Sequence, residues 1–117
     1  MNMLKITKEA MKSARRFYKN APTEEVRISY SASEDSPYAS ILVYYMQVEK
    51  HAPGKIKNEF YYVNRTMAFL SVVAIMNVLN KHGVKCEVKE LQEWSHYFVI
   101  RINPDEIKET VIHTMKD

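Results

Sequence analysis

The fold is decided by the stretch NRTMAFLSVVAIMNVLNKHG, residues 64–83. Its nearly continuous apolar run predicts one long helix from about Arg65 to His82, with Asn64 as the N-terminal cap. Gly83 suits the residue just beyond the helix end, because glycine readily adopts the left-handed conformation found there. Apolar residues cover most of the circumference of this helix, so we expect it to be central and buried on more than one side.

Alternating apolar and polar residues on both sides of this helix predict about five strands. Three precede the helix, at about 25–32, 39–49 and 57–63, and two follow it, at about 84–89 and 97–102. The segment Ala52–Lys55 has the proline and glycine of a type II turn. We therefore expect the second and third strands to form a hairpin.

Helices are also predicted near both ends of the chain. Thr7 can cap a helix over 8–19, which Pro22 ends, and Pro104 can begin a last helix. The order α-β-β-β-α-β-β-α predicts an α+β fold. We expect a single domain, 1–117, with a mostly antiparallel sheet of about five strands and a central buried helix.

The composition is that of a globular intracellular protein. Of its 117 residues, 46% are hydrophobic and 26% are charged, which argues against intrinsic disorder. The single cysteine allows no internal disulfide, and the N-terminus lacks the apolar segment of a signal peptide. The longest apolar stretch, 67–76, is shorter than the roughly 20 residues that cross a bilayer. We expect a cytoplasmic protein in a reducing compartment, with no membrane contact.

Residue patterns typical of enzymes are weak or missing. Gly54 and Gly83 lie far apart, which excludes Gly-rich phosphate and dinucleotide loops in their standard forms. Glu87-Val88-Lys89 has the Glu-x-Lys spacing of some nucleases, but the upstream carboxylate that their metal needs is not where that fold would put it. The histidines show no metal-ligand spacing, and Cys86 is expected to be a small buried side chain. We predict no metal, no cofactor and no enzymatic activity.

The most informative feature is a basic stripe on the first predicted helix. Residues 1–20 carry six basic side chains and one acidic one, a local charge of +5 in a chain whose net charge is +3. On a helical wheel, five of the basic residues fall within an arc of about 100°. These are Lys8, Lys12, Arg15, Arg16 and Lys19.

Such a stripe is suited to docking on a polyanion. Clustered Lys and Arg side chains bind phosphate backbones favourably, because each neutralised phosphate releases counterions. An acidic protein surface would also fit, and so would a plain solvated helix face with no ligand. A membrane surface fits less well, because the apolar face of the same helix is small and is needed for the core.

Tyrosines form a second candidate site. Tyr44-Tyr45 and Tyr61-Tyr62 lie in the two strands of the expected hairpin, where adjacent residues point to opposite faces. Tyr44 and Tyr61, if outward, could stack on single-stranded nucleic acid or anchor a protein partner. Cross-strand packing that only stabilises the hairpin is the alternative.

These observations predict a small non-enzymatic binding protein whose basic helix face engages nucleic acid or another polyanion. The alternative is a phage- or mobile-element-type accessory protein that binds and inhibits a host protein, such as a nucleic-acid-handling or defence complex. A homodimer through the 65–82 helix is compatible with either function, because a helix that is apolar all round needs a second covering surface.

Overall fold

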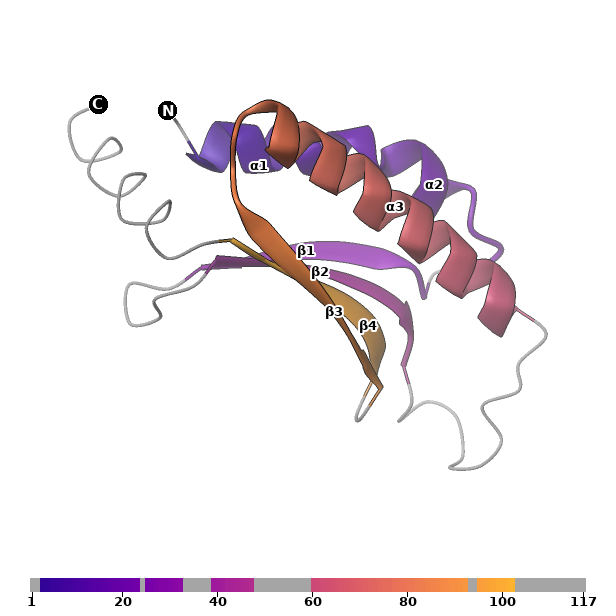
Figure 1. Ribbon diagram of the computed structural model, residues 1–117. Helices are drawn as coiled ribbons and strands as arrows, with labels where there is room; N and C mark the ends of the chain where they lie inside the picture. The colour runs from indigo at the N-terminus through magenta and orange to yellow at the C-terminus, as the bar shows by residue number, and fades with distance from the viewer. Residues whose placement is uncertain (1–2, 24, 33–38, 48–59, 93–94, 103–117) are drawn as a thin grey trace.

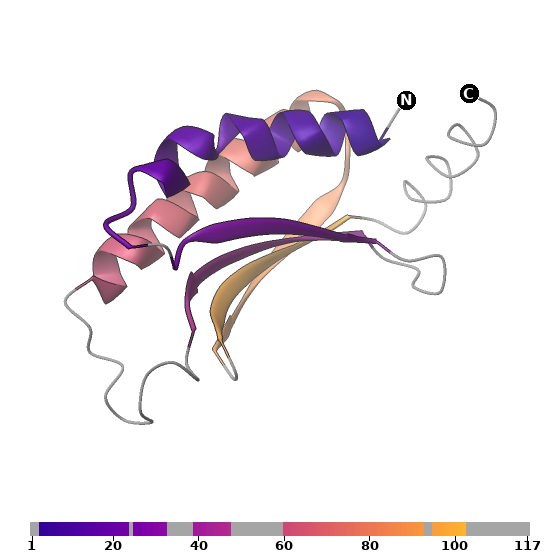
Figure 2. The ribbon, with the colours of Figure 1, turned by 180° about the vertical axis from the view of Figure 1, so that it is seen from behind.

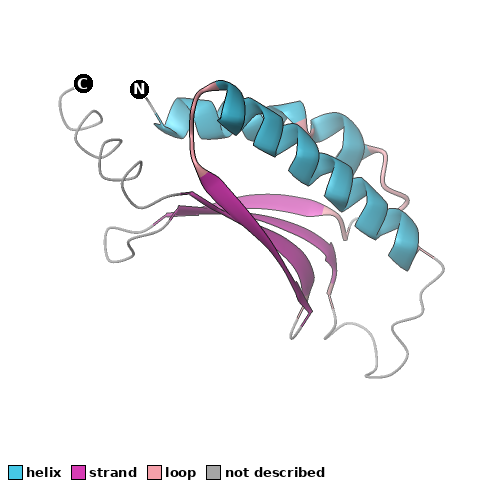
Figure 3. Cartoon of the chain, in the orientation of Figure 1, coloured by secondary structure: helices cyan, strands magenta, loops and turns pink. Residues whose placement is uncertain are grey.

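The described part of the chain forms two layers, a sheet and a set of helices that lie on one face of it (Figure 1). The computed structural model describes residues 3–23, 25–32, 39–47, 60–92 and 95–102. Within these ranges there are three helices and four strands, coloured separately in Figure 3. The expected α+β class is confirmed, but the sheet has four described strands instead of about five.

The sheet is antiparallel throughout. Its strands, β1 (Arg27–Ala32), β2 (Ala39–Met46), β3 (Cys86–Gln92) and β4 (His96–Ile102), are arranged in the order β1-β2-β4-β3. Both β1 and β4 pair with β2, and β3 pairs with β4. The expected hairpin between 39–49 and 57–63 is therefore wrong. The last predicted helix, from Pro104, and the turn at Ala52–Lys55 lie outside the described residues.

The first helix begins earlier than predicted and is broken once. It consists of α1 (Met3–Ser13) and α2 (Arg15–Lys19), joined at Ala14. Two short-range hydrogen bonds tighten the chain there: the Ala14 amide donates to the Met11 carbonyl (3.2 Å) and the Phe17 amide to the Ala14 carbonyl (3.0 Å). Thr7 is not the cap, because Met3 and Ile6 extend the buried face towards the N-terminus.

The long helix, α3 (Tyr61–Lys81), also begins earlier than predicted. Residues 61–63, expected in a strand, are its first turn, because packing outweighs the strand preference of aromatic and β-branched residues. Tyr61 here packs edge-on against Tyr45 of β2, with ring centroids 5.9 Å apart. Asn64 is a buried residue of the helix rather than its cap, and its Nδ2 donates to Thr23 Oγ1 at 2.9 Å.

The end of α3 is the predicted one. Gly83 has a φ of 75°, the left-handed conformation that favours glycine. Its amide donates to the Asn80 carbonyl (3.0 Å), and the Val84 amide donates to the Leu79 carbonyl (2.9 Å). These two bonds form a Schellman motif, in which the buried Leu79 and Val84 supply the usual apolar contact. The motif turns the chain from α3 towards β3.

The core lies between α3 and the inner face of the sheet. The buried residues of α3 recur every three or four positions and so share one face: Asn64, Ala68, Ser71, Val72, Ile75 and Leu79. They pack with buried residues of β2 and β4 that include Ile41, Val43 and Ile100. The helices α1 and α2 lie beside α3 on the same side of the sheet, as both views of the ribbon show (Figure 2).

The α3 helix packs on the sheet with one side and against α1 and α2 with another, so the expected burial on more than one side is confirmed, but a remaining flank is exposed. Tyr62, Phe69 and Val73 are 74%, 52% and 41% exposed. By length and composition alone, α3 is apolar enough to cross a membrane. Its buried face, however, packs on the sheet in the way of a core helix in a globular domain.

Replacing Gly83 by alanine should destabilise the fold by about 1 to 2 kcal/mol, because a Cβ disfavours the left-handed backbone. A Cβ at this position would meet no atom within 4 Å, so the backbone conformation alone accounts for the cost. Urea unfolding of Gly83→Ala measures it. Gly83→Asn is the matched control and should lose less, because asparagine tolerates this conformation better. Equal stability of both variants and the parent would contradict the Schellman ending of α3.

Candidate functional site

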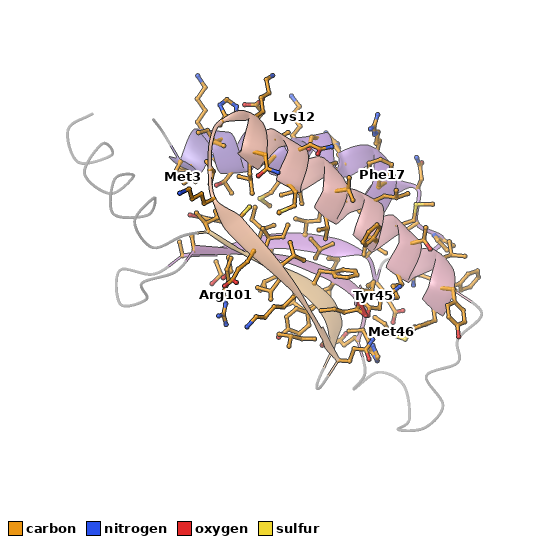
Figure 4. All side chains as sticks on the ribbon, viewed as in Figure 1. Met3, Lys12, Phe17, Tyr45, Met46 and Arg101 are labelled. Atoms are coloured by element: carbon orange, nitrogen blue, oxygen red, sulfur yellow. The ribbon has the colours of Figure 1, made fainter. Side chains whose placement is uncertain are left out.

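The five basic residues of the predicted stripe are all exposed on the helix layer. Lys8 and Lys12 come from α1, and Arg15, Arg16 and Lys19 come from α2. We call this set the basic face. It lies away from the buried residues Met3, Ile6 and Ala10, which hold α1 on the core. Figure 4 shows Lys12 pointing away from the sheet.

Few interactions within the protein restrain the basic face. In the described ranges, none of the five side chains forms an ion pair with an acidic residue. The Arg16 guanidinium lies 4.7 Å above the ring of Phe17. Glu9, the one acidic residue of α1, is instead 3.2 Å from His82 at the end of α3. The positive charge of the basic face is therefore available to a ligand.

The break at Ala14 changes the shape of this face. The wheel that placed five residues within one arc assumes a straight helix, whereas α2 begins a new helical segment after Ala14. Lys8 and Lys12 thus lie on one segment and the other three residues on the next. The outward orientation of all five survives the break, because Ala10 and Ala14 remain fully buried beneath them.

The two tyrosines of the second candidate site do not share a surface. Tyr44 lies on the outer face of the sheet, where its ring is 5.2 Å from that of Tyr97 on β4. Tyr61 is the first residue of α3, not part of a strand, and it packs against Tyr45 on the inner side. Neither tyrosine belongs to the same surface as the basic face. The core separates Tyr44 from that face, and Tyr61 lies at the start of α3.

A polar and aromatic cluster that sequence reasoning missed ties the start of α3 to the sheet. Arg65 of α3 makes two hydrogen bonds to the Glu90 carboxylate of β3, at 3.1 and 2.7 Å. The hydroxyl of the fully buried Tyr45 donates to Glu90 Oε1 (3.0 Å), and Gln92 Nε2 donates to the same oxygen (2.9 Å). A pairing of Arg65 with Glu90 has no local sequence signal, since the contact depends on how α3 lies over the sheet.

His96 is buried beside this cluster. Its ring centroid is 5.7 Å from that of Tyr45 and 5.4 Å from that of Tyr61. Neither ring nitrogen has a hydrogen-bond partner among the described residues. Burial lowers the pKa of His96, while the negative charge of Glu90 opposes that shift. The hydrogen bonds from Arg65 lower the pKa of Glu90, so the cluster holds an ionised carboxylate next to a neutral imidazole.

The sequence raised Cys86, Glu87 and the histidines as candidates for chemistry, and the structure places them as follows. No three His, Cys, Asp or Glu side chains among the described residues are placed to hold a metal ion. Cys86 is half-buried, its thiol donates to the Met76 sulfur at 3.3 Å, and burial raises its pKa. A raised pKa disfavours the thiolate that a nucleophile needs. Glu87 lies opposite Arg101 on the neighbouring strand, in the register of an ordinary cross-strand pair.

Comparison with known proteins adds no assignment: no protein-family model, no curated protein and no solved structure matches this chain.

The protein should lose stability as the pH falls through about 6.5, the value at which a histidine takes up a proton in an unfolded chain. Because burial lowers the folded-state pKa of His96, the unfolded chain binds that proton first and is favoured. The loss ends below the folded-state pKa. The lowered pKa of Glu90 adds a second loss, at pH values below about 4.3.

Chemical denaturation between pH 5 and 8 measures the first effect. His96→Phe keeps an aromatic ring in contact with Tyr45 and Tyr61 but cannot titrate. The difference between parent and variant isolates His96 from the other histidines and should grow in favour of the variant towards low pH. A difference that does not change with pH would contradict a neutral, buried imidazole.

Proposed function

We propose that this chain is a small non-enzymatic binding protein that engages the phosphate backbone of nucleic acid through its basic face. The observation that carries the proposal is the set of five exposed Lys and Arg side chains with no acidic partner among the described residues. The local charge of +5 over residues 1–20 exceeds the net charge of the whole chain, +3. The attraction is therefore concentrated on α1 and α2.

The dimensions of the basic face suit a backbone contact. From Lys8 to Lys19 a helix would span about 16 Å, and the break at Ala14 shortens this somewhat. That is about half of the roughly 34 Å pitch of a DNA duplex. Side chains of Lys and Arg at this spacing can each neutralise one phosphate, and each neutralised phosphate releases counterions.

The strength of binding should fall steeply with salt. If all five side chains contact phosphates, log K against log salt should have a slope of about −4 to −5 for a DNA duplex. Fluorescence anisotropy with a labelled 20-base-pair duplex measures this slope. A flat salt dependence would remove the electrostatic basis of the proposal.

Reversing two charges on the face should weaken binding at least tenfold and make the salt slope less negative by about 2. Lys12→Glu with Arg15→Glu is the suitable variant, because it leaves the contact of Arg16 with Phe17 in place. Lys81→Glu with Lys85→Glu is the matched control, since both residues are exposed and the formal charge change is the same. Equal losses in both variants would mean that only net charge matters and that the face is not a site.

A second candidate function is supported by the exposed flank of α3. Tyr62, Phe69 and Val73 form an apolar stripe on the surface, of the kind that marks protein contacts. This stripe favours an accessory protein that inhibits a host protein, and it also offers a surface for a homodimer. An acidic protein surface could in addition replace nucleic acid on the basic face.

Purification from nuclease-treated lysate separates these functions. A stoichiometric protein partner that remains after nuclease treatment and is lost with Phe69→Ser supports the accessory function. A monomer in sedimentation at high micromolar concentration would exclude the homodimer. If the parent chain retains only nucleic acid, and loses it after nuclease treatment, the accessory function is wrong.

A further inference from the structure

The outer face of the sheet has a regular arrangement of side chains. Strand register places one row across all four strands, in the order Arg27, Tyr44, Tyr97 and Leu91. Because side chains alternate between faces, this row shares its face with Leu42 and Val99 one step along the sheet. Lys89, next to Val99 on the edge strand β3, and Arg101 belong to the same face. An aromatic and aliphatic centre is thus bordered by cations.

No described helix covers this face, because α1, α2 and α3 all lie on the other side of the sheet (Figures 1 and 2). Figure 4 shows Arg101 on the side away from the helices, opposite Lys12. Tyr44 and Tyr97 are only half-buried, and Arg27 and Lys89 are exposed. An antiparallel sheet with a solvated face usually carries polar residues there, so two tyrosines and two leucines call for an explanation.

The tyrosines are arranged to offer ring surface. Their centroids are 5.2 Å apart and their planes are inclined by 37°, so the two rings pack at a tilt against each other at the centre of the sheet. The Arg27 guanidinium of the edge strand β1 lies over the Tyr44 ring, 5.9 Å from the ring centroid. Aromatic rings and arginine planes are the groups on which unpaired bases stack.

The charge of the face selects among ligands. Arg27 and Lys89 stand on the two edge strands, at opposite margins of the aromatic centre. Glu87 is the one acidic residue on the described part of the face, and it lies across from Arg101. A stack of planar groups with a cation at each margin matches a ligand of planar bases joined by phosphates.

We infer that the outer face of the sheet binds single-stranded nucleic acid. Tyr44 and Tyr97 stack on unpaired bases, and Arg27 and Lys89 contact phosphates on either side. This inference rests on the proposed function, because it also takes nucleic acid as the ligand. The binding surface is a different one, on the opposite side of the molecule from the basic face. A duplex would not serve, because its bases are already stacked and expose no ring surface to a sheet. Three strand spacings give a width of about 14 Å, enough for two or three nucleotides.

The base requirement is tested with two probes that have equal numbers of phosphates. One is a labelled ten-nucleotide oligothymidylate, and the other is an abasic oligomer of the same length. Stacking predicts that the parent chain binds the thymidylate at least about fivefold more tightly, whereas a purely electrostatic contact would not distinguish them. Equal affinity for both probes would overturn the inference.

The tyrosines are tested by two double variants. Tyr44→Ala with Tyr97→Ala should weaken thymidylate binding by about 5- to 150-fold for each stacked base. Tyr44→Phe with Tyr97→Phe keeps the rings and should bind like the parent, which guards against a loss caused by unfolding of the alanine variant. Tyr62→Ala, at the most exposed described tyrosine, lies on α3 away from this face and should have no effect. Stacking on this face would be contradicted if the phenylalanine pair weakened thymidylate binding as much as the alanine pair does. It would also be contradicted if Tyr62→Ala weakened thymidylate binding.

Failure of this inference can be told apart from failure of the proposed function. If the charge reversal at Lys12 and Arg15 abolishes duplex binding while the tyrosine variants leave thymidylate binding unchanged, the proposed function of the basic face is supported and the inferred site on the sheet is wrong. If the tyrosine variants reduce thymidylate binding but duplex binding has no salt dependence, the inferred site on the sheet is supported and the proposed function of the basic face is wrong. If neither probe binds and a protein is retained that the alanine pair releases, the face is a protein interface and the inference is wrong.

Discussion

Burial of one face of α3 on β2 and β4 is the contact on which the rest of the structure depends. Ile75 and Leu79 are fully buried there, and burying a large apolar side chain contributes about 1.5 to 3 kcal/mol. Gly83 then turns the chain sharply enough for β3 to join the same sheet. Another side of α3 forms the surface against which α1 and α2 pack.

This arrangement gives the molecule two sides of different chemistry. The helix layer presents exposed cationic side chains, which suit phosphates but carry no information about bases. The opposite face of the sheet presents rings held by strand register, which suit planar groups. The cluster around Glu90 joins α3 to the edge strand and keeps the two layers in register, because Arg65, Tyr45 and Gln92 all bond to one carboxylate.

Local patterns predicted most elements but not their partners. Alternation located β1, β2 and β4 to within a few residues, and the apolar run located α3. Local preference favours a strand over residues 61–63, because tyrosine and valine favour strands, whereas packing such as the contact of Tyr61 with Tyr45 makes their helical form favourable. The residue types of Thr7 and Asn64 predict helix caps, because capping is predicted from residue type alone. Both residues are instead buried within helices, and burial depends on the whole fold.

The order of residues alone makes α1 and α2 basic outside and apolar inside, because helical periodicity is a local property. It also determines the end of α3, since one glycine in a left-handed conformation suffices. The contacts of Tyr44 with Tyr97 and of Arg65 with Glu90, in contrast, depend on the folded arrangement of the whole chain. Those pairs join residues far apart in the chain, and their meeting follows from strand order and register, which depend on how the whole core packs.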